Sequence, residues 1–117
     1  MKDKIGDIQR AKHILDAINE INHFVENLDV EQFEASSLIR SATERQLMIV
    51  GEASIYLTEE TKEKHPEIDW RGIKGFRNII THEYFGVSIK MIWAVVIKEL
   101  PKLKIVAEKI IEDLQEK

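Results

Sequence analysis

Apolar residues recur at steps of three and four along most of the chain, and this is the period of an amphipathic α-helix. The clearest stripe predicts a first helix over residues 5–28. It consists of Ile5, Ile8, Ala11, Leu15, Ile18, Ile21, Val25 and Leu28. A polar connection over residues 29–36 follows, in which Phe33 is an apolar anchor. A second stripe predicts the next helix, with Leu38, Ala42, Ile49, Ala53 and Tyr56 facing inward.

Gly51 lies inside this second predicted helix. Glycine destabilises a helix interior by ~1 kcal/mol relative to alanine. We therefore expect a neighbouring helix to approach closely at Gly51. Pro66 marks the end of the linker after this helix, because proline pushes the preceding residue out of the helical region.

The second half of the chain carries further helix signals. Asp69 is a suitable N-cap for a third helix that runs through Trp70, Ile73, Phe76 and Ile80, and Gly86 is a suitable C-terminal stop. Ser88 can cap a fourth helix with Ile89, Ile92, Trp93, Val96 and Leu100 inward. Pro101 fits the first turn of a fifth, with Leu103, Val106, Ile110 and Leu114 inward. The pattern predicts one all-α domain over residues 1–117, an antiparallel four-helix bundle with an additional short C-terminal helix.

Composition narrows the functional classes. The chain has no cysteine, which excludes disulfides, thiol nucleophiles and cysteine-ligated zinc. Its longest apolar run, residues 91–97, is far below the ~20 residues that span a bilayer, and the first residues lack the apolar run that is typical of a signal peptide. We expect a soluble, cytoplasmic protein without a membrane partner.

Charge is unevenly distributed along the chain. The net charge is −4, yet residues 62–90 carry six basic and four acidic side chains, a net +2 that leaves −6 elsewhere. A weakly basic zone of this kind can hold a short stretch of phosphate backbone, although it does not support strong sequence-independent binding over a long footprint.

Arg77 interrupts the apolar stripe of the third predicted helix, because it falls about 40° from Ile73 around the helix. A guanidinium there needs a carboxylate, backbone carbonyls or a ligand anion, since an unpaired buried charge is costly. Two interpretations stay open. Arg77 pairs with Glu44, Glu52 or Asp69 as a structural residue, or it binds an anionic ligand.

Asn78 and His82 are four residues apart, so they are neighbours on a regular helix, and Asn78 can fix the orientation of the imidazole. A histidine at a helix end is also a common C-terminal cap. Arg77 and His82 lie about 140° apart around an ideal helix. Both side chains reach one phosphate only if the helix loosens before His82 or if two chains build the site across a two-fold axis.

The other histidines do not form a metal site. His13 and His23 are ten residues apart on the first predicted helix, ~15 Å along its axis, which is too far for a shared metal ion. His65 precedes Pro66 in a loop without a companion at ligand spacing. The sequence predicts neither a metal nor another cofactor.

The segment from Arg77 to Tyr84 reads Arg-x4-His-x-Tyr and resembles the motif of HepT-type toxins in the HEPN superfamily. Further blocks resemble that family in order and spacing, so that the resemblance covers most of the chain from the second helix onward. They are residues 44–53 (ERQLMIVGEA), 65–70 (HPEIDW), 84–87 (YFGV), Trp93 and 100–103 (LPKL). Arg-x4-His alone is a weak signal; together with Asn78, Tyr84 and these blocks it is strong.

The resemblance implies a HEPN-like bundle that forms a two-fold homodimer and cleaves RNA without a metal ion at a composite cleft. It implies catalytic roles for Arg77 and His82, supported by Asn78. It also implies a partner, a minimal nucleotidyltransferase antitoxin that transfers AMP to Tyr84. The RNA would supply its own nucleophile, the 2′-hydroxyl, with imidazole as acid or base and guanidinium holding the phosphate.

Two alternatives remain at this point. The bundle can be a non-catalytic module that holds a nucleotide or a partner enzyme, in which case substitutions at Arg77 and His82 weaken complexes and no ribonuclease activity exists. It can also be a structural helical dimer with Arg77 in an interfacial ion pair, in which case Arg77→Ala lowers thermal stability alone.

Overall fold

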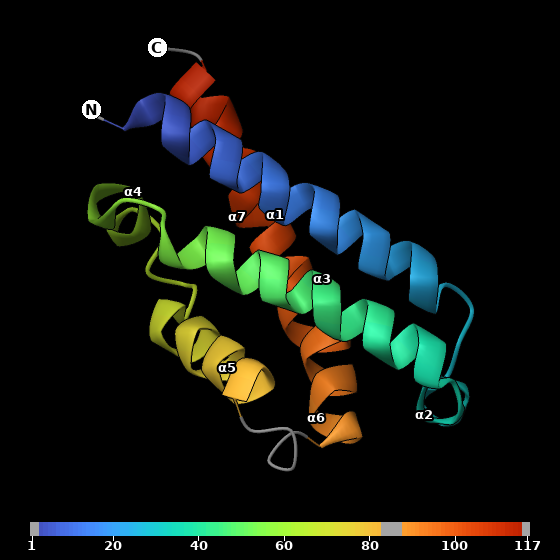
Figure 1. Cartoon of the computed structure of the whole chain (residues 1–117). Helices are drawn as coiled ribbons and strands as arrows, with labels where there is room; N and C mark the ends of the chain where they lie inside the picture. The colour runs from blue at the N-terminus through green and yellow to red at the C-terminus, as the bar shows by residue number, and fades with distance from the viewer. Residues whose placement is uncertain (1–2, 83–87, 116–117) are drawn as a thin grey trace.

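The computed structural model describes residues 3–82 and 88–115, with the side chain of His82 left out. These residues form helices and connections, with no β-strand among them, and measure 46 × 28 × 21 Å overall. In chain order the helices are α1 (Lys4–Val25), α2 (Val30–Ala35), α3 (Ser37–Ile55), α4 (Glu59–Glu63), α5 (Trp70–His82), α6 (Ile89–Ala94), the π-helical turn η2 (Val95–Glu99) and α7 (Leu100–Gln115). The long helices α1 and α3 lie side by side in opposite directions, with α7 behind them and α5 below α3 (Figure 1). The predicted all-α fold is confirmed.

The stripe predicted for the first helix forms one side of the core. Six of the apolar residues of α1 are buried: Ala11, Ile14, Ala17, Ile18, Ile21 and Val25. The N-terminal end differs from the prediction, because Ile5 is 77% exposed while Asp7 is completely buried. The helix also ends three residues earlier than predicted, and Asn27 follows it in the left-handed conformation with φ 64°.

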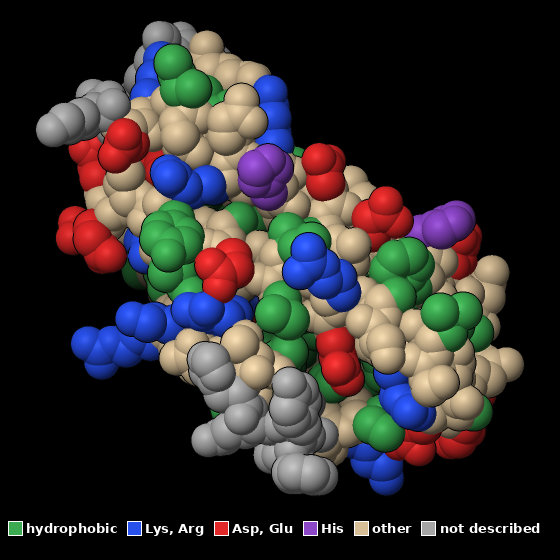
Figure 2. All heavy atoms as spheres, viewed as in Figure 1, with side chains coloured by type: hydrophobic (Ala, Val, Ile, Leu, Met, Phe, Trp, Pro, Cys, Tyr) green, Lys and Arg blue, Asp and Glu red, His purple; other side chains and the backbone are tan. Residues whose placement is uncertain are grey.

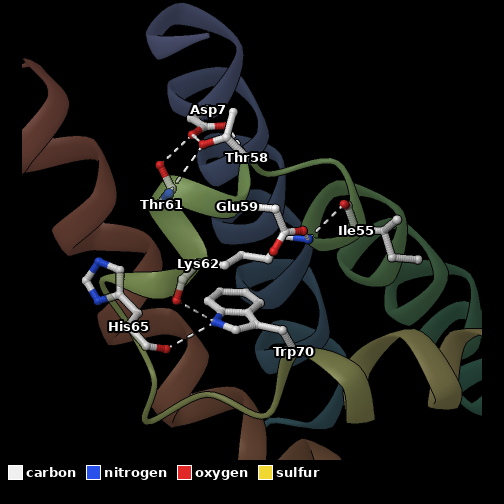
Figure 3. Close-up of polar contacts among 8 residues, drawn as sticks. All are labelled: Asp7, Ile55, Thr58, Glu59, Thr61, Lys62, His65 and Trp70. Atoms are coloured by element: carbon white, nitrogen blue, oxygen red, sulfur yellow. Dashed lines mark hydrogen bonds and ion pairs between the residues drawn. The ribbon is translucent and has the colours of Figure 1, made fainter. Parts of the chain in front are cut away.

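The buried carboxylate of Asp7 is satisfied by the start of α4 (Figure 3). It accepts hydrogen bonds from the backbone N–H of Thr58 at 3.0 Å, from the Thr58 hydroxyl at 2.7 Å and from the Thr61 hydroxyl at 2.5 Å. Thr58 in turn caps α4, since its hydroxyl accepts from the backbone N–H of Thr61. The side chain of Asp7 thus fixes α4, the short helix that precedes α5. The sequence pattern did not predict α4.

The connection predicted over residues 29–36 contains the short helix α2. Asp29 and Gln32 form a reciprocal capping box, with backbone-to-side-chain distances of 2.8 and 2.9 Å. The predicted anchor is confirmed, because Phe33 is fully buried and its ring lies 5.1 Å from that of Trp93.

The inward face predicted for the second helix is right at Ala53 and wrong at its two ends. In α3, Leu38 is 79% exposed and Tyr56 is 62% exposed. The buried residues are Thr43, Leu47, Val50, Gly51, Ala53 and Ser54. The physical reason is that α3 packs against α1 on one side and α5 on another, and small residues such as Gly51 and Ser54 permit that close contact.

The C-terminal part of the chain is more continuous than predicted. Ser88 caps α6 as expected, with its hydroxyl accepting from the backbone N–H groups of Lys90 and Met91. Pro101 does lie in the first turn of α7, but α6, η2 and α7 follow one another without a break. The predicted short C-terminal helix is therefore a 16-residue continuation. Inside a helix, proline lacks the N–H for the backbone hydrogen bond, and its ring collides with the carbonyl four residues earlier. The π-helical turn η2 lies directly before α7 and changes the backbone hydrogen bonding at this point, so that the helix continues through Pro101.

Of the nine core residues predicted for this part, seven are buried, and Ile89 and Trp93 are half-buried against the core. The seven are Ile92, Val96, Leu100, Leu103, Val106, Ile110 and Leu114. Of the described helices, none is long and apolar enough to cross a membrane.

Candidate functional site

Arg77 lies on α5 at a close contact with α3. A Cβ built on Gly51 would meet the Cβ and Cγ atoms of Arg77 at 2.7 Å, which is shorter than real carbon atoms tolerate. The prediction that Gly51 admits a neighbouring helix is confirmed. The absence of a side chain at Gly51 therefore lets the stem of Arg77 lie directly on α3.

The guanidinium of Arg77 pairs with Glu52, the residue after this glycine. The distance from Nη1 of Arg77 to Oε1 of Glu52 is 2.5 Å, and the two side chains are 22% and 48% exposed. The carboxylate of Asp69 is engaged elsewhere, since it accepts from the backbone N–H of Gly72 at 2.9 Å and caps α5 as predicted. Of the predicted partners, Glu52 is therefore the one that the structure pairs with Arg77.

The rest of the guanidinium keeps hydrogen-bonding capacity. Arginine offers five N–H donors, and the pair with Glu52 uses one of its terminal nitrogens. The Nε atom of Arg77 is buried and has no hydrogen-bond partner among the described residues. A partly exposed cation with unused donors can bind an anion in addition to its carboxylate partner.

The remaining predicted site residues lie toward the end of α5. Asn78 is exposed, whereas its neighbour Arg77 is mostly covered. His82 is the last residue of α5, and its side chain is outside the described part. Tyr84 also lies outside the described residues. The structure therefore places Arg77 and Asn78 and does not test whether Arg77, His82 and Tyr84 converge.

The course of the α5 backbone bears on one of the two arrangements left open by the sequence. The α-helix continues without interruption from Trp70 to His82. It does not loosen before His82, so the Arg77 and His82 positions stay about 140° apart around one helix. The separation of the two positions around the helix is therefore the one that the sequence predicts for a regular helix.

A cleft of about 270 Å³ opens beside Arg77, between α3, α5 and the segment from η2 into α7. Its wall is mainly apolar and includes Leu47, Val50, Ile73, Phe76, Val95, Leu100 and Leu103. Charged residues also line it, namely Glu67, Asp69, Arg77, Glu99 and Lys102. The cleft therefore offers an apolar surface next to the guanidinium.

A second hollow lies between α1 and α3, and Glu52, the ion-pair partner of Arg77, is one of its lining residues. Glu52 and Tyr56 line it together with Arg10, His13 and Arg45. The sequence pattern missed this surface, because it placed Tyr56 in the core. No local signal reveals it, because the hollow depends on how α1 lies against α3.

His65 has structural surroundings, whereas His13 and His23 are exposed. His65 is largely buried, its Nδ1 lies 3.7 Å from a carboxylate oxygen of Glu67, and its carbonyl accepts from the indole N–H of Trp70 at 3.1 Å (Figure 3). Within residues 3–82 and 88–115, no group of three His, Asp or Glu side chains is placed to hold a metal ion.

Comparison with known proteins gives one consistent family. The model of the family described as "Ribonuclease HepT-like" matches residues 14–110. The protein named "Putative RNase MJ1380" of Methanocaldococcus jannaschii is 37% identical over 91 residues, which cover 78% of this chain and 84% of that protein. The protein named "Probable ribonuclease HepT" of Thermococcus cleftensis is 36% identical over 91 residues, covering 78% of this chain and 83% of its own. No solved structure gives a significant match.

Proposed function

Because this chain belongs to the HepT-like ribonuclease family, we propose that it is a metal-independent endoribonuclease toxin whose site is built by Arg77 and His82 from two copies of the chain. Ribonuclease activity is the common feature in the names of its relatives. The observation that carries the assignment of Arg77 is its position in the lining of a cleft, where Glu52 holds the guanidinium and the Nε atom has no hydrogen-bond partner among the described residues.

The proposed reaction uses the RNA's own 2′-hydroxyl. A base removes the 2′ proton, the 2′ oxygen bonds to phosphorus, and the bond from phosphorus to the 5′ oxygen breaks. An acid protonates the departing 5′ oxygen, so the products carry a 2′,3′-cyclic phosphate and a 5′-hydroxyl. Imidazole can serve as acid or base near neutral pH, typically for ~10²–10⁴-fold in rate.

Arg77 stabilises charge in this reaction. An arginine guanidinium is a cation whose planar set of donors matches phosphate oxygens in pairs. The carboxylate of Glu52 holds the guanidinium in place, 2.5 Å away. Asn78, exposed on the same helix and four residues before His82, supports the imidazole.

A two-fold dimer satisfies the geometry of α5. Since the Arg77 and His82 positions lie about 140° apart around one uninterrupted helix, a site that combines them draws Arg77 from one copy and His82 from the other. A two-fold axis then creates two equivalent sites along one groove. The homodimer is part of the proposal.

Expression of the protein in a bacterial host tests the activity. The wild-type chain should arrest growth and degrade RNA, leaving 2′,3′-cyclic phosphate ends. His82→Ala should be harmless while remaining folded and dimeric. A folded dimer whose Arg77→Ala and His82→Ala variants lose complexes, with no cleavage by the wild type, would instead establish the non-catalytic alternative.

We propose further that a minimal nucleotidyltransferase antitoxin neutralises the toxin by modifying Tyr84. The tyrosine oxygen attacks the α-phosphorus of ATP, a bond to AMP forms and pyrophosphate leaves. The added phosphate would repel RNA near the motif through like charge and bulk. After incubation with the cognate transferase and ATP, mass spectrometry should find one AMP on Tyr84 and none on Tyr84→Phe. An unmodified Tyr84 would contradict this regulation.

A further inference from the structure

The outward face of α3 carries exposed apolar side chains between two charges. Six positions recur at alternating steps of four and three and fall within a sector of about 80° around the helix. They are Leu38, Ala42, Arg45, Ile49, Glu52 and Tyr56, and together they form the outer stripe. Leu38 is 79% exposed and Tyr56 is 62% exposed, whereas Ala42 and Ile49 are half-buried. Figure 2 shows hydrophobic side chains exposed between charged ones along the face that α1 and α3 share.

The spacing of the outer stripe is that of a seam between two helices. Steps of four and three repeat every seven residues, which keeps one stripe in contact with a partner helix along its length. The buried Thr43, Leu47, Val50 and Ser54 lie about 120–180° from Leu38 around α3, on the side of the core. The outer stripe therefore lies on the side of α3 away from its own core, where a helix of another molecule can contact it.

The two charges of the outer stripe indicate which molecule this is. Arg45 has no ion-pair partner within residues 3–82 and 88–115. Glu52 lies two helical turns further, ~10.5 Å along the axis. In a two-fold antiparallel pair of α3 helices, Arg45 of each copy lies opposite Glu52 of the other, so that two ion pairs form. A parallel pair would place Arg45 opposite Arg45 and Glu52 opposite Glu52, and like charges repel.

The apolar members of the outer stripe fit the same antiparallel arrangement. The two-fold axis falls between residues 48 and 49, halfway between the two charges, so Ile49 lies next to Ile49 of the second copy. Leu38 of one copy then comes within one helical turn of Tyr56 of the other. The hollow between α1 and α3, about 520 Å³ in volume, is lined by Ile49 and Tyr56 and has room for side chains of the second copy. A second copy of this chain therefore matches the stripe in both charge and apolar surface.

We propose that α3 is the centre of the homodimer interface, packed antiparallel against α3 of a second copy, with Arg45 of each copy bound to Glu52 of the other. The inference rests on the proposed function, which requires a homodimer, and it names the surface that forms it. Glu52 also pairs with Arg77 of its own chain. The interface thus runs beside both Arg77 side chains, which is where a site built from two copies needs them.

Disulfide cross-linking tests the position and direction of this interface, since the chain has no cysteine of its own. Ile49→Cys, next to the axis, should form a linked dimer under mild oxidation, because a disulfide needs Cα atoms within about 7 Å. Leu38→Cys is the matched control for direction. Antiparallel pairing holds the two copies of residue 38 about 30 Å apart, whereas parallel pairing would bring them together. Ile105→Cys, 55% exposed on α7, measures random oxidation.

Charge reversal tests the ion pairs, with the dimer dissociation constant measured by sedimentation over a dilution series. Arg45→Glu places like charges opposite each other across the axis, and so does Glu52→Lys, so each variant alone should dimerise about tenfold more weakly or worse. In an equal mixture the two variants restore both ion pairs, and a heterodimer about as tight as wild type should form. The matched control, Lys109→Glu on an exposed position of α7, should stay within about twofold of wild type.

The outcomes separate this inference from the proposed function. If Ile49→Cys links no more than Ile105→Cys, or if Leu38→Cys links above that background, the inference is overturned. A dimer that cleaves RNA and fails the Ile49→Cys test leaves the nuclease function standing without this interface. A dimer that passes both tests and cleaves no RNA leaves the interface standing without the nuclease function. A wild-type monomer that cleaves RNA overturns both this interface and the two-copy site.

Discussion

A single methyl group at Gly51 should disturb both the stability of the bundle and the position of the guanidinium. In Gly51→Ala the new Cβ would lie 2.7 Å from the Cβ and Cγ of Arg77, whereas ordinary contact begins at 3.4 Å. The difference of 0.7 Å has to come from separation of α3 and α5, because both contacted atoms are close to the Arg77 backbone. Overpacking of this kind costs ~1–3 kcal/mol, and the better helix propensity of alanine offsets ~1 kcal/mol.

The expected net loss is therefore between about 0 and 2 kcal/mol of unfolding free energy. Gly75→Ala on α5 is the matched control for stability, because its Cβ meets nothing within 4 Å. It should gain up to about 1 kcal/mol. Urea titration of both variants measures this contrast.

The effect of Gly51→Ala on activity should be larger than its effect on stability. A displacement of about 1 Å can lower a catalytic rate by about 10²-fold. We expect cleavage of an unstructured RNA to fall by about that factor in single-turnover assays, with the variant still folded. If Gly51→Ala is as stable as Gly75→Ala and cleaves RNA at the wild-type rate, the contact between α3 and Arg77 neither limits packing nor positions the guanidinium, and the reasoning is refuted.

Three further predictions follow from the packing and the proposed dimer. Asp7→Asn should lower the free energy of unfolding in urea by about 2 kcal/mol, because a buried carboxylate with three hydrogen bonds is lost; an unchanged midpoint would contradict this. Phe33→Ala should cost about 3–5 kcal/mol by calorimetry, since the ring is fully buried; a loss below 1 kcal/mol would show that the anchor is dispensable. An equal mixture of Arg77→Ala and His82→Ala chains should recover about a quarter of the wild-type cleavage rate if each site draws on both copies, and complete inactivity would place each site within one chain.

Much of the bundle follows from the sequence because helical periodicity and capping are local signals. The stripe in α7 is buried as predicted, and the caps at Asp69 and Ser88 form as predicted. Gly51 also predicted a contact between distant parts of the chain, because a residue that is unfavourable inside a helix needs a compensating contact. The structure confirms this contact with Arg77 of α5. The partner of Arg77 could be narrowed to three carboxylates but not chosen, because that choice depends on how α3 lies against α5.

Other features depended on tertiary contacts that periodicity does not contain. The face of α3 was predicted only in part, because its buried side includes the polar Thr43 and Ser54, while Tyr56 faces outward. The burial of Asp7 depends on hydroxyl and backbone donors more than 50 positions away along the chain. The roles of His82 and Tyr84 remain predictions from the motif.

The central claim is that the RNA's own 2′-hydroxyl attacks the phosphorus under the control of Arg77 and His82. The most direct measurement is the single-turnover rate on an oligonucleotide that carries one 2′-deoxy substitution at the scissile nucleotide. We predict that cleavage at that bond is lost while neighbouring bonds are cut as before. An unchanged rate at the substituted bond would contradict the mechanism.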